Sequence, residues 1–357
     1  MHLLSTEFSP IPDLNYPFGD RWHAPIAEPY QVSDGIYWLR MPLPIALDHI
    51  NLWLLRDHDG WTIVDTGFDA PVCKQTWEQV FADFLSDQII NRIIVTHFHP
   101  DHIGLAAWLA EKHDVKIWMT RGEFDFYRTH VDRDREQYSK SVEGFVVELG
   151  LSSADQQSYL DFVNTGADPN TIRVAEEHCE FIADGDQIEI DGKSWQVVMG
   201  NGHSPEHACL YQADQGVLIS GDQALPRISS NISVFFVNKD EDPLNDWLTS
   251  CEKLKTNIPS DTLVLPSHQE PFIGIDQRMS QLIADHIAQL NVLRNHANQS
   301  FTCAEACQLL YKRELNGYIY IFAISETLAH INYLVCNGEL KQQKDDKGAI
   351  VYSAISD

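Results

Sequence analysis

Short apolar segments alternate with stretches of helical periodicity along the first part of the chain. Residues 70–85 show the helical pattern, because Trp77, Val80 and Phe81 fall on one side of the predicted helix. A hairpin signal at Asp57–Gly60 joins two of the strand-like segments. Alternation of this kind predicts a layered α/β fold. The predicted strands cover residues 36–39, 51–55, 61–64, 93–95 and 115–119.

The middle of the chain departs from this alternation. Residues 121–180 are polar and mostly helical in pattern, and we expect a helical insertion that serves as a lid or as a dimer surface. An ordinary surface excursion is the alternative. Strands return after it, and Asp242–Pro243 then begins a helix, with aspartate as the cap and proline in the first turn. The later strands are predicted at residues 187–190, 195–199, 208–211, 217–219 and 262–265.

Both ends of the chain differ from the strand-rich part. Residues 1–30 are rich in proline and aromatic residues without periodicity, and we expect an irregular arm laid over a domain. From residue 275 the pattern predicts one long helix, a short helix capped by Thr302, a third helix and a closing hairpin, which is the outline of a winged helix. We therefore divide the chain into a first domain, residues 1–274, and a winged-helix-like C-terminal domain, residues 275–357.

Charge and cysteine content narrow the classes of function. The net charge of -27 at pH 7 disfavours general binding to nucleic acids or anionic membranes, although it is compatible with a locally positive site. The seven cysteines form no CxxC pair, which fits a reducing compartment better than a disulfide framework. The N-terminus has no signal-peptide pattern, and no apolar run approaches the length of a membrane span. We expect a cytoplasmic protein that acts on a small molecule.

The segment Thr96–His102 holds the densest chemistry in the sequence. It lies between a predicted buried strand and a helical pattern, so its side chains can converge from a short turn. Imidazole and carboxylate groups are ligands that zinc and similar ions use. A lone histidine at such a turn is usually a capping or surface residue, but four potential ligands so close together favour a metal site. They are His97, His99, Asp101 and His102.

Further candidate ligands recur where predicted strands end. Each alone has a structural explanation, but their conjunction favours one shared polar site at one rim of the sheets. Glycines near several of them allow close approach of the backbone. His207 could reach the rim of this pocket, although a structural role is favoured for it. The strand-end candidates are Asp65, His97, His203, Asp222 and His268.

The segment His97–His102 is similar to the HxHxDH signature of the metallo-β-lactamase superfamily. The other family motifs are matched in order across residues 35–270 by Asp65, His203, Asp222 and His268. The resemblance implies an αββα sandwich with a dinuclear metal site at one edge. It implies that Asp222 bridges two divalent ions and that Asp65 orients a ligand. One ion would be held by His97, His99 and His203. The other would be held by Asp101, His102 and His268.

The resemblance also implies a hydrolase in which a hydroxide that bridges the two ions attacks the substrate. Asp101 and Asp222 are the expected catalytic residues, and zinc is the expected ion, with manganese and iron as alternatives. His99 stands where di-iron redox members carry glutamate, which favours hydrolysis. Asp222 stands where true β-lactamases carry cysteine or serine, which disfavours an antibiotic as substrate. We expect a small substrate with an ester-like bond, and a thioester is the first hypothesis. The substrate can carry anionic groups, because the site is expected to be locally positive.

Several alternatives stay open. Lactonases and glyoxalase II-like enzymes keep the bridging aspartate, although the C-terminal region does not resemble the glutathione-binding helices of glyoxalase II. Phe301–Thr302 and Ser325–Ile331 resemble the winged-helix-like region of the lactamase-beta-like endoribonuclease branch, which implies RNA cleavage, but the acidic composition counts against it. A homodimer is compatible with the sequence. A hypothesis of another class is a non-enzymatic binding protein, in which protein ligands would close a structural metal site.

Overall fold

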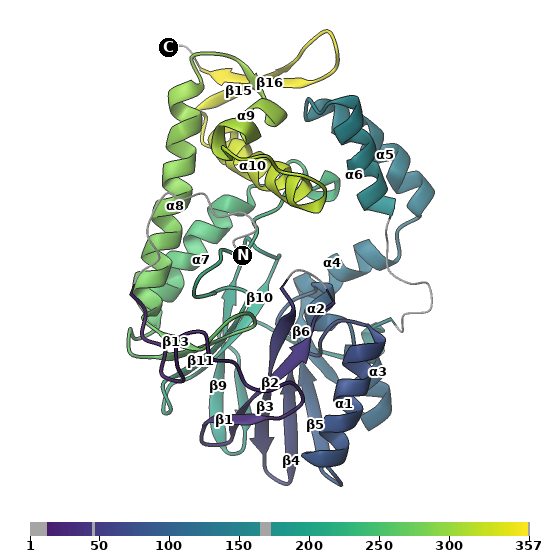
Figure 1. Cartoon of the computed structure of the whole chain (residues 1–357), viewed down its shortest axis with the longest axis vertical. Helices are drawn as coiled ribbons and strands as arrows, with labels where there is room; N and C mark the ends of the chain where they lie inside the picture. The colour runs from purple at the N-terminus through teal and green to yellow at the C-terminus, as the bar shows by residue number, and fades with distance from the viewer. Residues whose placement is uncertain (1–12, 45–46, 165–172, 356–357) are drawn as a thin grey trace.

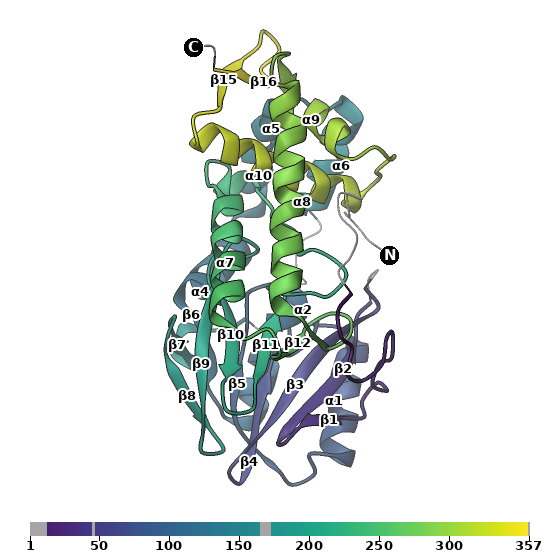
Figure 2. The ribbon, with the colours of Figure 1, turned by 90° about the vertical axis from the view of Figure 1, so that its left-hand side faces the viewer.

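Two β-sheets pack face to face in the lower part of the molecule, and helices cover their outer sides (Figure 1, Figure 2). The computed structural model describes residues 13–44, 47–164 and 173–355. The first sheet follows chain order: β1 (Tyr30–Ser33), β2 (Ile36–Pro42), β3 (His49–Asp57), β4 (Gly60–Val64), β5 (Ile89–Ile94), β6 (Ile117–Thr120) and β7 (Cys179–Ile182). The second runs β13 (Phe272–Ile273), β12 (Leu263–Pro266), β11 (Val217–Gly221), β10 (His207–Gln212), β9 (Lys193–Gly200) and β8 (Gln187–Ile190).

The layers form the αββα sandwich that the sequence predicted. Helices α1 (Pro71–Asp83) and α3 (Ala106–His113) pack their apolar sides on the first sheet, and α7 (Pro243–Asn257) packs on the second. Between the sheets lies a separate apolar cluster that includes Trp38, Trp53 and Leu210. Because β3 is covered on both faces, nearly all of its residues are buried, and its central residues 52–55 form an apolar run and not an alternating pattern.

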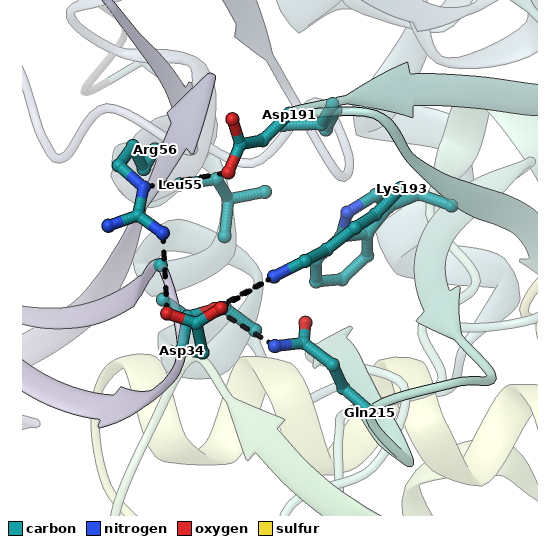
Figure 3. A pocket seen from close by; sticks show the side chains of 10 residues that line it. Asp34, Leu55, Arg56, Asp191, Lys193 and Gln215 are labelled. Atoms are coloured by element: carbon teal, nitrogen blue, oxygen red, sulfur yellow. Dashed lines mark hydrogen bonds and ion pairs between the residues drawn. The ribbon is translucent and has the colours of Figure 1, made fainter. Parts of the chain in front are cut away.

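Parallel pairing brings several strand ends to one edge of the sandwich. β4 pairs in parallel with β5, so Asp65 and the segment after β5 leave the first sheet at the same edge. β11 pairs in parallel with β12, so Asp222 and His268 leave the second sheet side by side. This edge is where the candidate ligands gather. At the opposite edge, exposed ion pairs join the sheets around Asp34, with Arg56 at 3.3 Å and Lys193 at 3.1 Å (Figure 3).

The predicted insertion is helical and contacts the C-terminal part of the chain. It consists of α4 (Arg121–Val131), α5 (Arg135–Glu148) and α6 (Ser153–Asn164). The apolar sides of α5 and α6 share one buried cluster with the C-terminal helices, and the backbone nitrogen of Ala304 donates to the carbonyl of Leu149 at 3.0 Å. A role of this insertion as a lid or a dimer surface stays a prediction.

The C-terminal part contains the predicted helices and hairpin. They are α8 (Ile275–His296), β14 (Phe301–Thr302), α9 (Cys303–Leu310), α10 (Tyr318–Cys336), β15 (Leu340–Lys344) and β16 (Ile350–Ala354). Thr302 caps α9 as expected, since its hydroxyl accepts from the backbone nitrogen of Glu305. The three strands pair in the order β14, β16, β15. The winged-helix comparison and the boundary at residue 275 stay predictions.

The expectation that no apolar run is as long as a membrane span needs correction. By length and composition α10 could cross a membrane, contrary to the expectation that no apolar run reaches this length. Its apolar stretch is 61% buried within the molecule, against α7, α8 and α9, and a core helix has the same composition. Strand β1 begins at Tyr30, the last residue of the expected arm, and residues 1–12 lie outside the described part of the chain. Elsewhere the arm is irregular and touches both sheets, through Asn15 and Ile26.

Candidate metal centre

Seven side chains converge at the edge where the parallel strands end. All seven were predicted as ligands from the sequence, and the structure gathers them into two adjoining groups whose candidate ligand atoms lie within 4.8 Å of one another in each group. The first group contains His97, His99, His203 and Asp222. The second group contains Asp101, His102 and His268.

The carboxylate of Asp222 lies between the two groups and faces both. Its Oδ2 atom is 3.5 Å from Nε2 of His203 and 4.0 Å from Nε2 of His97. Its Oδ1 atom is 3.6 Å from Nε2 of His102 and 3.5 Å from Nε2 of His268. One oxygen is therefore directed to each group, which is the arrangement that a bridging ligand requires.

The spacing of these atoms fits divalent metal ions better than direct hydrogen bonding. Ligand atoms at about 2.1 Å from a tetrahedral ion lie about 3.4 Å from one another, close to the separations around Asp222. Among the residues that the structure describes, Nε2 of His102, Nε2 of His203 and Oδ1 of Asp222 are buried without a hydrogen-bond partner. Buried polar atoms are seldom left unpaired, so these atoms are suited to bind ions.

Burial and charge keep two of the candidate imidazole ligands neutral and one candidate carboxylate ligand ionised. Burial lowers the pKa values of His97 and His99 well below the usual range, so both imidazoles are neutral at pH 7. Burial would raise the pKa of Asp101, but the neighbouring His102 and His268 lower it to about 2. Neutral imidazoles and ionised carboxylates are the forms that coordinate metals.

Asp65 holds His102 in place, as expected of a residue that orients a ligand. Its Oδ2 atom lies 2.7 Å from Nδ1 of His102, which leaves Nε2 of that ring directed at Asp222. The same carboxylate accepts from the backbone nitrogen and the hydroxyl of Thr96, both at 2.8 Å. Asp65 adopts a positive φ of 60°, a conformation that aspartate tolerates better than most residues.

Backbone carbonyls orient two further histidines. Nδ1 of His203 donates to the carbonyl of Asn231 at 2.8 Å, and Nδ1 of His268 donates to the carbonyl of His49 at 3.2 Å. Each bond fixes the ring and leaves Nε2 directed into the site, next to Asp222.

His207 lies behind the proposed ligands and not at the rim of a pocket. Its ring is fully buried and stacks on His97 with centroids 4.8 Å apart. Its Nε2 atom accepts a hydrogen bond from the backbone nitrogen of Asp222 at 3.0 Å. This buried placement is compatible with the structural role that the sequence favoured for His207, and its partner is the backbone of Asp222.

Glu123 is a buried residue of the site that sequence reasoning missed. It lies on α4, and its Oε2 atom accepts from the backbone nitrogen of Phe98 at 2.9 Å. Its Oε1 atom accepts from the hydroxyl of Ser204 at 2.6 Å and from the backbone nitrogen of Glu206 at 2.7 Å. One carboxylate thus ties the His97–His102 segment to the loop that carries His203. The available signal was an acidic residue on the buried side of a helix.

Comparisons with known proteins cover most of the chain. The family model described as "Metallo-beta-lactamase superfamily" matches residues 46–268. A second model, described as "Metallo-beta-lactamase-like, C-terminal domain", matches residues 290–355. The first match spans all seven residues of the two ligand groups, and the second spans α9, α10 and the closing hairpin.

Individual proteins resemble the chain over most of its length. The Bacillus subtilis protein named "Probable metallo-hydrolase YqjP" is 23% identical, covering 85% of this chain and 92% of its own length. An acyl-coenzyme A thioesterase of Homo sapiens is 22% identical over 73% of this chain and 87% of its own. The crystal structure of a beta-lactamase domain protein from Burkholderia ambifaria is 39% identical and superposes with a TM-score of 0.82 over 96% of this chain and 97% of its own.

Proposed function

This chain belongs to the metallo-β-lactamase superfamily, as a metal-dependent hydrolase, and from that premise we propose that its substrate is an acyl thioester. The observation that supports hydrolysis is the pair of ligand groups that face the two oxygens of Asp222. The thioester is favoured by the similarity to an acyl-coenzyme A thioesterase and by an aromatic surface beside the site.

We propose that the two groups of residues hold two divalent ions, with Asp222 between them. Imidazole and carboxylate donors suit zinc first, with manganese and iron as alternatives. When bound, such ions supply Lewis-acid chemistry, which polarises a carbonyl oxygen and makes water acidic enough to attack near neutral pH. The first ion is assigned to His97, His99 and His203. The second is assigned to Asp101, His102 and His268.

The chain's own residues position the proposed ligands and accept the proton of the attacking water. Asp101 and Asp222 are the proposed catalytic residues, because both carboxylates are ionised at pH 7 and reach the site from opposite sheets. Each can accept a proton from an attacking water at an Oδ atom. Asp65 and Glu123 keep the histidines in place, so the geometry is set before a substrate arrives.

An aromatic surface, formed by Phe162, Phe235, Tyr318 and Phe322, supports an apolar acyl group. Phe162 contacts Tyr318 and Phe322 with ring centroids 5.6 and 5.9 Å apart, and Phe235 lies 6.4 Å from Phe322. Tyr318 is 60% exposed and Phe322 is 37% exposed. The surface adjoins the site through Asn231, which binds the carbonyl of Phe322 at 3.5 Å. Partly exposed aromatic rings next to a hydrolytic site suit an acyl chain.

The experiment is thiol release from a panel of acyl-CoA and acylglutathione thioesters by protein loaded with zinc or manganese. We expect release that a chelator abolishes and that Asp222→Ala abolishes. Asp34→Ala is the control, because Asp34 lies in the exposed ion-pair cluster at the opposite edge. Full activity of Asp222→Ala with both ions bound would contradict the bridge.

Lactones form the second arm of this panel, and single-stranded RNA forms the third. Hydrolysis of lactones without thiol release would replace the thioester by a cyclic ester and leave the metal centre unchanged. RNA cleavage is disfavoured by the net charge of -27. If no substrate class turns over and the ions bind in closed sites, a non-enzymatic binding protein replaces the enzyme. A cytoplasmic location and a homodimer are proposals that the panel leaves aside.

A further inference from the structure

One loop connects the candidate metal centre to the C-terminal helices, and we call residues 222–234 the metal-site loop. It begins with Asp222, which faces both ligand groups. Farther along it carries Asn231, whose carbonyl accepts the Nδ1 proton of His203 at 2.8 Å. The loop therefore supplies one proposed ligand and orients a second. Whatever fixes this loop also fixes two of the proposed ligands.

Helix α8 holds the first half of the metal-site loop through a buried arginine. Nε of Arg278 donates to the carbonyl of Leu225 at 2.6 Å, and Nη2 donates to the carbonyl of Ile228 at 2.7 Å. Burial lowers the pKa of Arg278 to about 10, so it is charged at pH 7. A buried charge is costly unless its donors are bonded. The guanidinium and the loop carbonyls therefore stabilise each other.

Helix α10 holds the second half. The side-chain nitrogen of Asn231 donates to Oε2 of the buried Glu326 at 3.0 Å. Beside this contact, the backbone nitrogen of Val234 donates to the carbonyl of Ser325 at 3.1 Å. Asn231 is thus bonded on both sides: its carbonyl binds His203, and its side chain binds α10.

We infer that Glu326 is a positioning residue of the metal centre and that the C-terminal helices complete it by holding the metal-site loop. Glu326 acts through Asn231 on His203, and Arg278 acts on the segment that follows Asp222. The inference rests on the proposed function in one respect, the assignment of His203 and Asp222 as metal ligands. Loss of an outer hydrogen-bonding partner that supports the ligands of a metal site typically lowers metal affinity 10- to 100-fold.

Cobalt(II) binding by the full-length chain tests this inference without any substrate. The visible absorption of bound cobalt reports the geometry of its ligands, and a titration gives the affinity. We expect Asn231→Ala and Glu326→Leu to weaken cobalt binding about 10- to 100-fold and to change the spectrum. Glu326→Gln keeps an oxygen that can accept from Asn231, so we expect it to bind cobalt nearly as the unmodified chain does.

A matched control lies on the same helix. The side chain of Asn332 donates to the carbonyls of Lys239 at 3.0 Å and Glu241 at 2.7 Å, so it attaches α10 to a segment outside the metal-site loop. We expect Asn332→Ala to leave the cobalt spectrum and affinity unchanged. An equal effect of Asn332→Ala and Asn231→Ala would overturn the inference, because general loosening of α10 would explain both.

Two further outcomes decide the inference independently of the thioester hypothesis. Unchanged affinity and spectrum in Asn231→Ala would overturn it, even if the chain hydrolyses thioesters. Weakened cobalt binding in Asn231→Ala, together with nearly unchanged binding in Glu326→Gln, would support it even if no thioester is cleaved. If Glu326→Leu does not fold, the comparison of Asn231→Ala with Glu326→Gln and Asn332→Ala still gives the answer.

Discussion

The backbone nitrogen of Asp222 donates to Nε2 of His207 at 3.0 Å, so a buried histidine positions the backbone of the proposed bridging ligand. Replacing His207 by alanine leaves this nitrogen without its acceptor and opens a cavity beside His97. We expect kcat/KM to fall about 10- to 100-fold. His207→Gln retains an acceptor oxygen and should recover part of the loss. Equal activity of His207→Ala and the unmodified enzyme would contradict this role.

Gly221 allows the close approach between β11 and His207. A Cβ atom at Gly221 would lie 2.4 Å from the His207 ring, and the residue has a positive φ of 52°. Gly221→Ala should therefore lose metal binding and stability, measured by metal content and chemical unfolding. Gly216→Ala is the matched control, since Gly216 has a φ of 61° with open space around it. Gly216→Ala should lower the free energy of unfolding by only about 1 kcal/mol, the cost of placing alanine at a positive φ.

The carboxylate of Glu123 accepts hydrogen bonds at both oxygens, and Glu123→Gln tests whether both are needed. The amide of glutamine has one acceptor oxygen and one donor nitrogen. Either the backbone nitrogen of Phe98 or the hydroxyl of Ser204 would therefore lose its acceptor and face the NH2 group. We expect a loss of about 1–3 kcal/mol in the free energy of unfolding and weaker metal binding. Glu176→Gln, in an exposed ion pair with Arg121 at the start of α4, should change neither quantity.

Phe322 should set the preference for acyl chain length if the aromatic surface binds the acyl group. Phe322→Ala removes apolar contact with the far end of a long acyl chain. The kcat/KM for a long-chain thioester should therefore fall about tenfold, while the kcat/KM for an acetyl thioester stays the same. Ile89→Ala, at an exposed apolar position on β5, is the control. A uniform loss across chain lengths would instead indicate damage to the metal centre.

The buried pair His286 and His330 should make the C-terminal region sensitive to acid. Nδ1 of His286 lies 3.1 Å from Nε2 of His330, whose Nδ1 donates to the carbonyl of Glu326 at 2.8 Å. Burial lowers the pKa of His330 to about 4 and the pKa of His286 well below its usual range. The unfolded chain takes up protons near pH 6.5 while the folded chain does not, so the free energy of unfolding falls as the pH drops below 6.5.

His330 alone should account for about 3 kcal/mol between pH 7 and pH 4. The measurement is urea unfolding of the chelated protein at several pH values, compared with His330→Gln. The variant should show a shallower loss of stability in acid. Parallel pH profiles for the two proteins would show that this pair does not carry the acid sensitivity.

The ligands of the candidate site could be predicted from sequence because each has a local signal. Four lie in one short segment, and the others follow apolar strands whose ends coincide once the parallel pairs form. The layered fold was predictable for the same reason, since buried strands and amphipathic helices have different periods. β7 was missed because its four residues include only one buried side chain, too short a pattern to recognise.

The residues that hold the ligands could not be found this way. Glu123 binds Ser204 across 81 positions, and Asn231 binds Glu326 across 95. Such contacts depend on how the insertion and the C-terminal helices pack, which hydrophobic periodicity within one segment does not encode. A buried carboxylate near the start of a polar helix resembles the acidic residues that commonly occupy a first helical turn. His207 differs from a rim residue only through its burial.

The link from Glu326 through Asn231 to His203 has a consequence for when the protein can acquire its metal. The ribosome synthesises the His97–His102 segment early. The hydrogen bond between Asn231 and Glu326, however, can form only after residue 326 has been synthesised. Until then the nascent chain contains several of the proposed histidine ligands, but their positions are not yet fixed. Stable loading with metal should therefore follow translation, so the supply of ions meets a nearly complete polypeptide.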